Sequence, residues 1–199
     1  MTLLERQAPP DPFVLFKKWF REAADSGAPQ PDAMTLATAS SDGTPSARMV
    51  LFKGLDDERF YFYSNYGSQK GHDLAENSRA ALVFFWIQTR HQVRVSGTVR
   101  RVSPAASAEY FDSRPRGAQL SALASRQSRV VRSREVLEKS VVNLAKQYPL
   151  VVPLPADWGG YALRPRWIEF WESRENRLHD RLRYRRRRPA GWRLERLAP

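Results

Sequence analysis

The sequence predicts a single α+β domain, mainly β, built on a closed or nearly closed β-barrel. Short runs rich in Val, Phe, Tyr and Trp recur between turn signals through most of the 199 residues. That spacing is typical of antiparallel meanders and barrels. Helical patterns interrupt the runs, but no internal repeat or low-complexity linker divides the chain. Residues 1–199 are therefore expected to form one domain with a substantial core.

The first predicted element is a helix that begins at Asp11-Pro12 and ends near Gly27. Asp is a favoured N-cap, and Pro suits the first helical position. Aromatic and aliphatic residues follow at helical spacing between positions 13 and 20. Residues 1–11 form a short N-terminal arm ahead of this helix.

Strands and further helices follow in order along the chain. Strands are predicted at 33–39, 47–53, 60–64, 80–87 and 92–102, with a turn at 41–45. Helices are predicted at 68–76, 104–112 and 133–147. Residues 158–199 are expected to carry the C-terminal strands, at 160–163, 167–171, 178–187 and 192–197.

The composition excludes several kinds of chemistry. The chain has no cysteine, which removes disulfides, thiol nucleophiles and zinc-thiolate sites and favours a reducing compartment. Its three histidines lack the spacing of metal ligands, so no metal is expected and redox chemistry would need an organic cofactor. Neither a signal peptide nor an apolar run of membrane-spanning length is visible. We therefore expect a cytoplasmic protein without a membrane partner.

The net charge of +12, from 33 Lys and Arg against 21 Asp and Glu, admits nucleic acid or small phosphorylated ligands as partners. Much of the excess lies in the arginine run at 181–188, beside a Pro-Ala-Gly turn at 189–191. This run is interpreted as a solvent-exposed hairpin tip. A surface for single-stranded nucleic acid would interleave exposed aromatic residues with the basic ones, and residues 183–188 contain only Tyr184. No nucleic-acid partner is expected, although a basic nucleic-acid-binding β-barrel stays open as an alternative of a different class.

A first group of candidate residues lies in the strand Arg48-Met49-Val50-Leu51-Phe52-Lys53. Strand alternation sends Arg48, Val50 and Phe52 to one face and the other three to the opposite face. A lysine at the end of an apolar face needs either solvent or an anion.

A second group surrounds the predicted start of the helix at 68–76. Tyr63 and Ser64 end a strand, and Gln69 and Lys70 lie in the segment Gly67–Gly71 that opens the helix. Backbone N–H groups, a hydroxyl, an amide and an ammonium together suit a phosphate. Many helix starts have this composition, so the motif alone does not decide the ligand.

Other polar residues could hold a phosphate or a planar ring. Tyr110 and Arg114 are spaced i, i+4, and a phenol beside a guanidinium can bind phosphate. The alternative is an arginine that interacts with a helix dipole. Gln92, Gln127 and Ser128 offer neutral donors that suit a flavin ring, but each is also an ordinary surface residue.

The run Arg177-Leu178-His179-Asp180-Arg181 follows an aromatic-rich strand at 167–171 that ends in Trp171. If the run continues as a strand, Arg177, His179 and Arg181 share one face. Such a face suits an anionic, planar molecule that can be oxidised or reduced. The alternative is a solvated strand face with cross-strand ion pairs.

In their order and spacing, these segments resemble the pyridoxine (pyridoxamine) 5'-phosphate oxidase family. The resemblance runs from about Asp11 to the C-terminus. The motifs that carry it are Arg48 to Lys53, Phe62-Tyr63-Ser64-Asn65, Gln92-Val93-Arg94-Val95, Tyr110-Phe111 with Ser113-Arg114-Pro115-Arg116, Arg126-Gln127-Ser128, Trp158-Gly159-Gly160-Tyr161, Ile168-Glu169-Phe170-Trp171 and Arg177 to Arg181.

The resemblance implies a homodimer of split β-barrels of the FMN-binding type with peripheral helices, and flavin mononucleotide (FMN) at the subunit interface. The implied reaction oxidises pyridoxine 5'-phosphate or pyridoxamine 5'-phosphate at C4' to pyridoxal 5'-phosphate, and O2 reoxidises the flavin to give peroxide. The implied FMN contacts are Arg48, Met49, Val50, Leu51, Phe52, Lys53, Tyr63, Ser64, Gln69, Lys70, Gln92, Gln127, Ser128, Trp171 and Arg181. The implied substrate contacts are Lys53, Tyr110, Arg114, Arg177, Leu178 and His179, with Arg177 and His179 as the candidate catalytic residues.

The chain departs from the family pattern in four places. Gln69 stands where Arg is usual, Ala118 where Ser is usual, and Ser173-Arg174 fills a stretch that is often glycine-rich. The N-terminal arm is also shorter than in many members. A flavin oxidase of the same fold with another substrate, of the phenazine-precursor type, is the nearest alternative activity.

Overall fold

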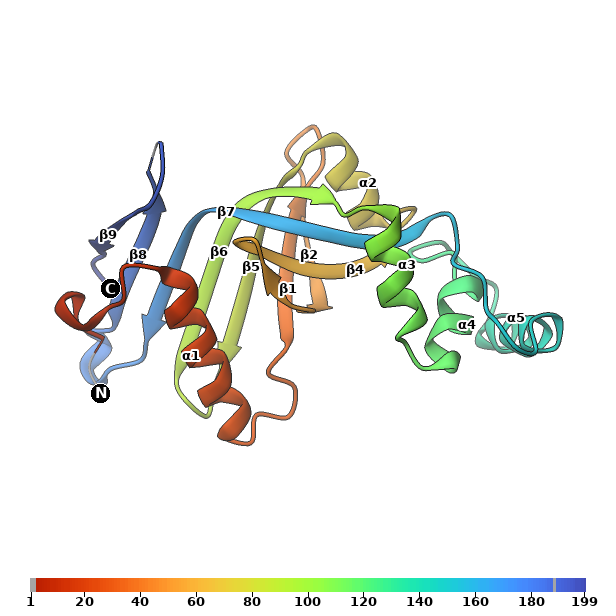
Figure 1. Ribbon diagram of the computed structural model, residues 1–199, viewed down its shortest axis with the longest axis horizontal. Coiled ribbons are helices and arrows are strands. Elements are labelled where there is room, and N and C mark those ends of the chain that lie inside the picture. The colour runs from red at the N-terminus through yellow and green to blue at the C-terminus, as the bar shows by residue number, and fades with distance from the viewer. Residues whose placement is uncertain (1–2, 188) are drawn as a thin grey trace.

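One nine-stranded antiparallel sheet organises the molecule (Figure 1). The computed structural model describes residues 3–187 and 189–199. The strands are β1 (Ala33–Ala39), β2 (Pro45–Leu51), β3 (Leu55–Asp56), β4 (Arg59–Asn65), β5 (Arg79–Trp86), β6 (His91–Arg101), β7 (Trp158–Glu172), β8 (Asp180–Arg186) and β9 (Trp192–Arg196). The helices are α1 (Pro12–Asp25), α2 (Gln69–Glu76), α3 (Pro104–Asp112), α4 (Arg116–Ala124) and α5 (Arg134–Gln147), with short 3-10 turns η1 (Glu5–Gln7) and η2 (Glu175–Arg177).

The sheet curls into a nearly closed barrel. Its strands follow the order β2-β1-β5-β6-β7-β4-β3, and the β8–β9 hairpin pairs with the C-terminal half of β7. The segment after β2 meets β4 through two backbone hydrogen bonds, Lys53 N to Tyr61 O at 2.8 Å and Tyr61 N to Gly54 O at 3.0 Å. The predicted α+β class with a nearly closed barrel is therefore confirmed.

A bend where β6 pairs with β7 helps the sheet to curl. The register shifts between Ser96 and Gly97, as at a β-bulge. A Cβ atom at Gly97 would lie 2.1 Å from the backbone oxygen of Arg164, so glycine is required there.

Aromatic side chains fill the barrel, and α1 covers it. Phe16 of α1 is 1% exposed, and its ring centroid lies 4.9 Å from that of Phe60 and 5.1 Å from that of Phe84. Aromatic pairs of this kind each contribute roughly 0.5–1.5 kcal/mol beyond the burial of their area. The predicted cap is also present, because the Asp11 side chain accepts a hydrogen bond of 2.9 Å from Phe13 N.

A second, smaller core holds α3, α4 and α5 against the N-terminal end of β7. It contains Phe111, Leu120, Val152 and Trp158. Figure 1 shows α4 and α5 at one end of the long axis, with β8 and β9 at the other end. Packing around this second core places α3 and α4 beside β2 and β4.

Several element boundaries differ from the predictions. The sequence reasoning missed α4 and β3, and it divided β7 into two strands. It was also wrong about the strand that carries the Arg177 motif, because β8 begins only at Asp180. Asn176 and Arg177 have positive φ values of 54° and 63°, so the chain turns there instead of continuing as a strand. No helix in the described ranges is both long and apolar enough to span a bilayer.

Candidate functional site

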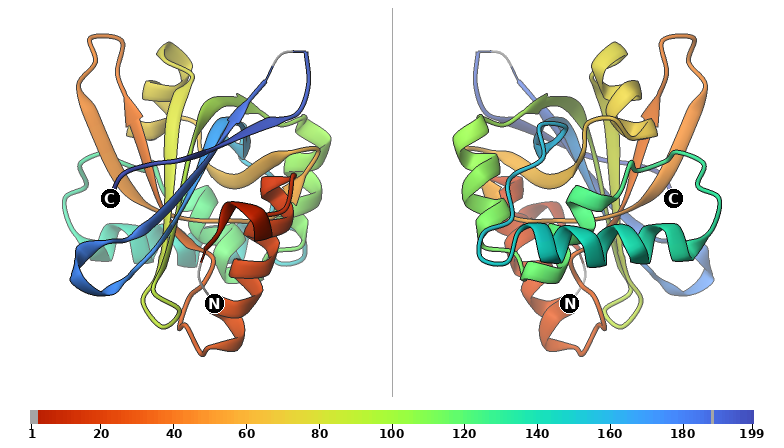
Figure 2. Two further views of the ribbon diagram at one scale, coloured as in Figure 1. Left: turned by 90° about the vertical axis from the view of Figure 1, so that its left-hand side faces the viewer. Right: turned by 90° about the vertical axis from the view of Figure 1, so that its right-hand side faces the viewer.

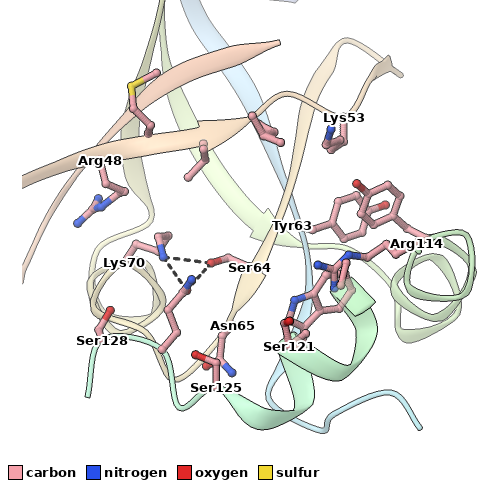
Figure 3. A pocket seen from close by; sticks show the side chains of 18 of the residues that line it. Arg48, Lys53, Tyr63, Ser64, Asn65, Lys70, Arg114, Ser121, Ser125 and Ser128 are labelled. Carbon is pink, nitrogen blue, oxygen red and sulfur yellow. Dashed lines mark hydrogen bonds between the residues drawn. The ribbon is translucent and has the colours of Figure 1, made fainter. Parts of the chain in front are cut away.

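A cavity of about 700 Å³ lies where β2 and β4 meet α2, α3, α4 and the loop before α5 (Figure 3). It brings together most of the residues that the sequence singled out for a cofactor or substrate. The predicted residues that line it are Arg48, Met49, Val50, Leu51, Lys53, Tyr63, Ser64, Gln69, Lys70, Tyr110, Arg114, Gln127 and Ser128.

Lys70 is the central cation at one end of this cavity. Its ammonium donates to Ser64 Oγ at 3.1 Å, Ser68 Oγ at 3.2 Å and Gln127 Oε1 at 2.9 Å. The side chain is only 7% exposed, and these acceptors are all neutral. Because burial disfavours the charged form and Arg48 adds repulsion, the pKa of Lys70 falls to about 8. A bound anion would relieve both effects.

The local fold at the start of α2 explains why Lys70 is held there. Ser68 is the N-cap and accepts from Gly71 N. A Cβ atom at Gly71 would lie 2.1 Å from Tyr66 O, so only glycine allows this close approach of the helix to the preceding turn. The first turn of α2 therefore presents its backbone N–H groups and Lys70 together, as in anion sites at helix N-termini.

Arg48 lies next to the buried carboxylate of Asp73, and both are close enough to Lys70 to influence its charge. The Arg48 guanidinium donates to Thr38 Oγ1 at 2.6 Å and lies 3.6 Å from Asp73 Oδ2. Asp73 is 2% exposed and also accepts from Thr38 Oγ1 and from Gln69 Nε2, at 2.5 and 2.8 Å. Gln69 is therefore tied to Asp73, and Arg48 contributes charge from a position fixed by β1 and α2.

The other end of the cavity holds Lys53 and Arg114 beside a stack of aromatic rings. Tyr63 and Tyr110 stack with their centroids 3.8 Å apart, and Tyr63 lies 5.6 Å from the Trp158 ring. The Arg114 guanidinium lies 4.8 Å over the same Trp158 ring.

Arg114 is held partly desolvated. Its NH1 atom is buried without a hydrogen-bond partner, and burial lowers the pKa of the guanidinium. Lys53 has one anionic neighbour, Asp32 Oδ2 at 2.9 Å. Figure 3 shows Lys53 and Arg114 well apart from Arg48 and Lys70. The cavity thus has two separate cationic ends, with Met49, Val50 and Leu51 along the side formed by β2.

A further group of predicted residues lies outside this cavity, on three neighbouring strands. Gln92 of β6 faces Trp171 of β7, which in turn faces Arg181 of β8. Arg181 Nε donates to Glu169 Oε1 at 2.9 Å, and its NH1 donates to Ala198 O at 2.9 Å. Arg181 thus makes the kind of cross-strand ion pair that the alternative interpretation describes, and its predicted contact with FMN stays a prediction.

Arg177, Leu178 and His179 lie in the turn between β7 and β8. Arg177 and Leu178 are exposed, whereas the His179 ring lies 4.7 Å from the Trp171 ring. Arg177 and His179 line a separate hollow rather than the main cavity. Figure 1 places this turn and the α3–α4 region on opposite sides of the subunit. Phe52 is another predicted FMN contact that does not line the main cavity, because its side chain is buried in the barrel core.

Sequence reasoning missed several residues of the cavity. They are Asn65, Ala118, Ser121, Ala122, Ser125 and Trp158, although Ala118 had been noted as a departure from the family pattern. The serines and alanines come from the missed helix α4 and the residue that follows it. A periodicity of small residues at i, i+3, i+4 and i+7 from Ala118 to Ser125 was the available signal. Trp158 belongs to one of the quoted family motifs, but its place in the cavity was identified only from its contacts with Arg114 and Tyr63.

Comparison with known proteins identifies the family. A family model described as pyridoxamine 5'-phosphate oxidase matches residues 20–148, and one described as the pyridoxine 5'-phosphate oxidase C-terminal dimerisation region matches residues 158–199. The chain belongs to the pyridoxamine 5'-phosphate oxidase family. This membership confirms the predicted enzyme class, an FMN-dependent oxidase of pyridoxine and pyridoxamine 5'-phosphates. The match to a dimerisation region supports the predicted homodimer.

Individual members are similar over nearly the whole chain. A pyridoxine/pyridoxamine 5'-phosphate oxidase of Salinibacter ruber is 57% identical over 192 residues, which are 95% of this chain and 89% of that protein. One of Rubrobacter xylanophilus is 52% identical over 198 residues, 99% of this chain and 91% of that protein.

Two solved structures are also similar. PhzG from Burkholderia lata 383, in complex with tetrahydrophenazine-1-carboxylic acid, is 31% identical with a TM-score of 0.93, covering 100% of this chain and 98% of its own. A pyridoxamine 5'-phosphate oxidase-related, FMN binding protein of Nostoc punctiforme PCC 73102 is 18% identical with a TM-score of 0.75 over both whole chains, which shows the shared fold.

Proposed function

We propose that this protein is a homodimeric oxidase that converts pyridoxine 5'-phosphate and pyridoxamine 5'-phosphate to pyridoxal 5'-phosphate, with FMN bound between the subunits and O2 as the electron acceptor. The observation that carries the proposal is the presence of two cationic ends in one cavity (Figure 3). A cofactor and a substrate that each carry a phosphate need two such ends.

The end that contains Lys70 suits the FMN phosphate. Lys70 is buried among neutral oxygens, and the start of α2 adds backbone N–H donors. Ser64 and Ser128 place hydroxyl groups on the same cavity wall. Gln127 would turn from Lys70 toward the flavin or hold Lys70 in place. The residues present therefore fit FMN.

The end that contains Lys53 and Arg114 suits the substrate phosphate. The unpartnered NH1 atom of Arg114 supplies a donor that the folded chain does not use. The Tyr110 phenol lies on the same wall and can donate as well. The Lys53 ammonium would contact the phosphate either in place of Asp32 or together with it.

The remaining predicted contacts would come from the partner subunit. Gln92, Trp171 and Arg181 form one row on the sheet, and Arg177 and His179 lie just beyond it. None of them is among the residues that line the cavity of the same chain, and the β7–β8 turn lies at the opposite end of the subunit from α3 and α4 (Figure 1). A two-fold dimer brings each subunit's row to the other's cavity if the two surfaces are in contact, since such interfaces use the same patches from both subunits.

The chemistry is divided between cofactor and protein. When bound, FMN would supply the two-electron acceptor for the hydride removed from C4', with O2 as the final acceptor of the electrons. The chain's own residues hold the phosphate at Lys53 and Arg114, while Arg177 and His179 orient the ring and C4'. Orientation of this kind can remove on the order of 7 kcal/mol from the barrier. The stacked rings of Tyr63, Tyr110 and Trp158 line the substrate end with aromatic surface.

A second candidate is an oxidase of a phenazine precursor, favoured by the similarity to PhzG. That PhzG complex contains a tricyclic carboxylic acid without a phosphate. A tricycle of that kind does not require both Lys53 and Arg114. The paired cations and the buried free donor of Arg114 therefore favour the phosphorylated pyridine.

The test is a direct assay of the purified protein. It should be yellow, its heat-released flavin should be FMN, and it should form pyridoxal 5'-phosphate and peroxide from both phosphorylated substrates. The unphosphorylated vitamin should be oxidised far less efficiently. Equal rates with and without the phosphate, or efficient oxidation of a dihydrophenazine carboxylic acid instead, would contradict the proposed substrate.

A further inference from the structure

The turn between β7 and β8 is held by one arginine that contacts residues on both sides of it. Arg174 Nε donates to Asp180 Oδ2 at 2.8 Å, and Arg174 NH2 donates to Glu172 Oε2 at 3.0 Å. Its backbone N–H donates to His179 Nδ1 at 3.0 Å. One residue thus joins the last residue of β7, the first residue of β8 and the imidazole of His179.

The anchor at Asp180 is itself fixed by a second arginine. Asp180 Oδ1 accepts from Arg196 NH1 at 2.7 Å, and Arg196 NH2 also donates to Glu5 Oε2 at 2.8 Å and to Leu3 O at 2.9 Å. Figure 2 shows the N-terminal segment beside β8 and β9, where these contacts form. Although burial raises the pKa of Asp180, hydrogen bonds from Arg174 and Arg196 bring it below its ordinary value. Asp180 is therefore a charged anchor at neutral pH.

The turn needs such an anchor because its backbone is unfavourable without one. Asn176 and Arg177 both have positive φ values, at 54° and 63°. Residues other than glycine adopt this region at an energetic cost, and arginine does so less readily than asparagine. A conformation of this kind persists where surrounding contacts determine it. The contacts made by Arg174 span these two residues.

The bond to His179 also determines which ring nitrogen carries the proton. Because Nδ1 accepts a hydrogen bond from the Arg174 backbone, the neutral imidazole must carry its proton on Nε2. Trp171 lies against the ring, with the two centroids 4.7 Å apart. His179 is therefore arranged to offer Nε2–H as a donor.

We propose that Arg174 is a positioning residue, which holds the β7–β8 turn so that His179 offers Nε2–H to the oxygen or nitrogen on C4' of the substrate. The inference rests on the proposed function, since it assigns His179 to the substrate. The role assigned to Arg174 is indirect. It acts through the backbone geometry of residues 174–180, with Glu172 and Asp180 as its anchors.

The first experiment reads the tautomer of His179 directly by ¹⁵N NMR, using the FMN-loaded protein without substrate. The wild type should show a single tautomer protonated at Nε2. Arg174→Ala keeps the backbone N–H but removes the guanidinium, so the two ring-nitrogen signals should move toward the averaged values of a mixed population. Glu172→Gln removes one charge of the anchor and should produce a smaller shift of the same sign. Unchanged signals in Arg174→Ala would overturn the proposal.

The second experiment measures turnover with pyridoxine 5'-phosphate. Arg174→Ala should lower kcat roughly tenfold, the loss expected when one oriented hydrogen bond is disordered, with FMN affinity unchanged. Arg174→Lys restores the charge but cannot bridge Glu172 and Asp180 in the same fork, so rescue should be partial. The matched control is Arg59→Ala, which removes an exposed arginine paired with Asp57 in the β3–β4 turn and should change neither quantity. If Arg174→Lys restored kcat fully, the claim that Arg174 must bridge Glu172 and Asp180 would be wrong.

Flavin absorbance and thermal midpoint establish that each variant is folded. Should Arg174→Ala fail to fold, Glu172→Gln decides the question with the same readouts. The two proposals can fail separately. If the His179 tautomer responds to Arg174 while the wild type does not oxidise the substrate, only the proposed function is wrong.

Discussion

The ammonium of Lys70 lies 2.9 Å from Gln127 Oε1, and this bond joins the start of α2 to the loop between α4 and α5. The two residues are 57 positions apart. The contact closes one end of the cavity around a desolvated cation. Lys70 also contacts Ser64 and Ser68, so every acceptor that the folded chain offers it is neutral. The pKa of about 8 makes the charge of this site sensitive to mildly alkaline pH.

FMN affinity should therefore fall as pH rises through about 8. Below that pH Lys70 is charged in the free protein and attracts the phosphate; above it, binding must be accompanied by proton uptake. The dissociation constant should rise by at most about tenfold per pH unit. Quenching of FMN fluorescence, titrated at several pH values, measures it. Lys70→Gln should bind FMN more weakly and should lose most of this dependence. An identical slope in the variant would assign the titration to another group.

The main helices and most strands could be predicted because their signals are local. Asp11-Pro12 ahead of an aromatic stripe indicates α1, and the structure confirms both the cap and the buried face. Helix α4 gave no such signal. Its sequence contains Gly117 and Ser121, its N-cap Pro115 makes no side-chain cap bond, and only Leu120 is buried. It is a helix mainly because Leu120 packs in the second core.

The Arg177 motif shows what sequence alternation cannot provide. A strand was a reasonable prediction from residues 177–182, but the backbone at Asn176 and Arg177 depends on ion pairs made by Arg174. Likewise, hydrophobic or charge periodicity does not show which residues distant in sequence come together in space. The motif that contains Lys70 could be recognised because its residues are close in sequence, whereas Asp73 and Trp158 required the fold.

His91 should make the protein lose stability in mild acid. Its ring stacks on Trp19 with centroids 3.8 Å apart, Nδ1 has no hydrogen-bond partner, and burial lowers its pKa to about 4. Between about pH 6.5 and 4 the unfolded state binds a proton at this site that the folded state does not, so the free energy of unfolding falls as pH falls. The contribution is at most about 3 kcal/mol, and less because the site is only half-buried.

Urea denaturation at several pH values checks this expectation. His91→Phe retains a ring against Trp19 and removes the titration, so its stability should depend less on pH in that window. His72→Phe is a control histidine variant on α2. An unaltered pH profile in His91→Phe would show that other groups control the acid transition.

The proposed dimer predicts that two impaired variants can complement each other when activity is measured at a substrate concentration well below the wild-type KM. Arg114→Ala damages the cavity, and His179→Ala damages the turn between β7 and β8. If each active site takes its cavity from one subunit and its turn from the partner, a mixed dimer contains one site without either substitution. Random reassembly of equal amounts should recover roughly a quarter of wild-type activity.

Reassembly is measured after dissociation in mild denaturant, with each variant alone carried through the same steps. As a reference, the double variant Arg114→Ala, His179→Ala is mixed with wild type, because each shared site of that mixed dimer carries one of the two substitutions. No recovery above the separate variants would place the cavity and the turn of one site in the same subunit. A protein that is a stable monomer by light scattering and still binds FMN with full affinity would likewise contradict a site shared between subunits.

The last prediction separates phosphate anchoring from work at the reacting carbon. Arg114→Ala should mainly raise KM, because an anchor used equally in the ground and transition states contributes uniform binding. Loss of a charge-assisted contact of about 1.5–3 kcal/mol corresponds to roughly ten- to a hundred-fold. His179→Ala should instead lower kcat, since its donor acts on C4'. Arg134→Ala is the control, because that arginine is 85% exposed and its ion pair within the described part of the chain is with Glu138 of the same helix, α5.

The structure sharpens how Arg114 should behave. Its guanidinium lies over Trp158 and its NH1 atom is buried without a partner, so Arg114→Lys would retain the charge but lose both the stacking and the second donor. We expect Arg114→Lys to raise KM nearly as much as Arg114→Ala, whereas Lys53→Arg should be tolerated better at its more open position beside Asp32. Initial rates with pyridoxine 5'-phosphate and with the unphosphorylated vitamin complete the test. Removal of Arg114 should erase much of the difference between the two substrates, because that difference is the binding energy of the phosphate. If Arg114→Ala leaves the preference for the phosphorylated substrate intact, the phosphate is held elsewhere in the cavity.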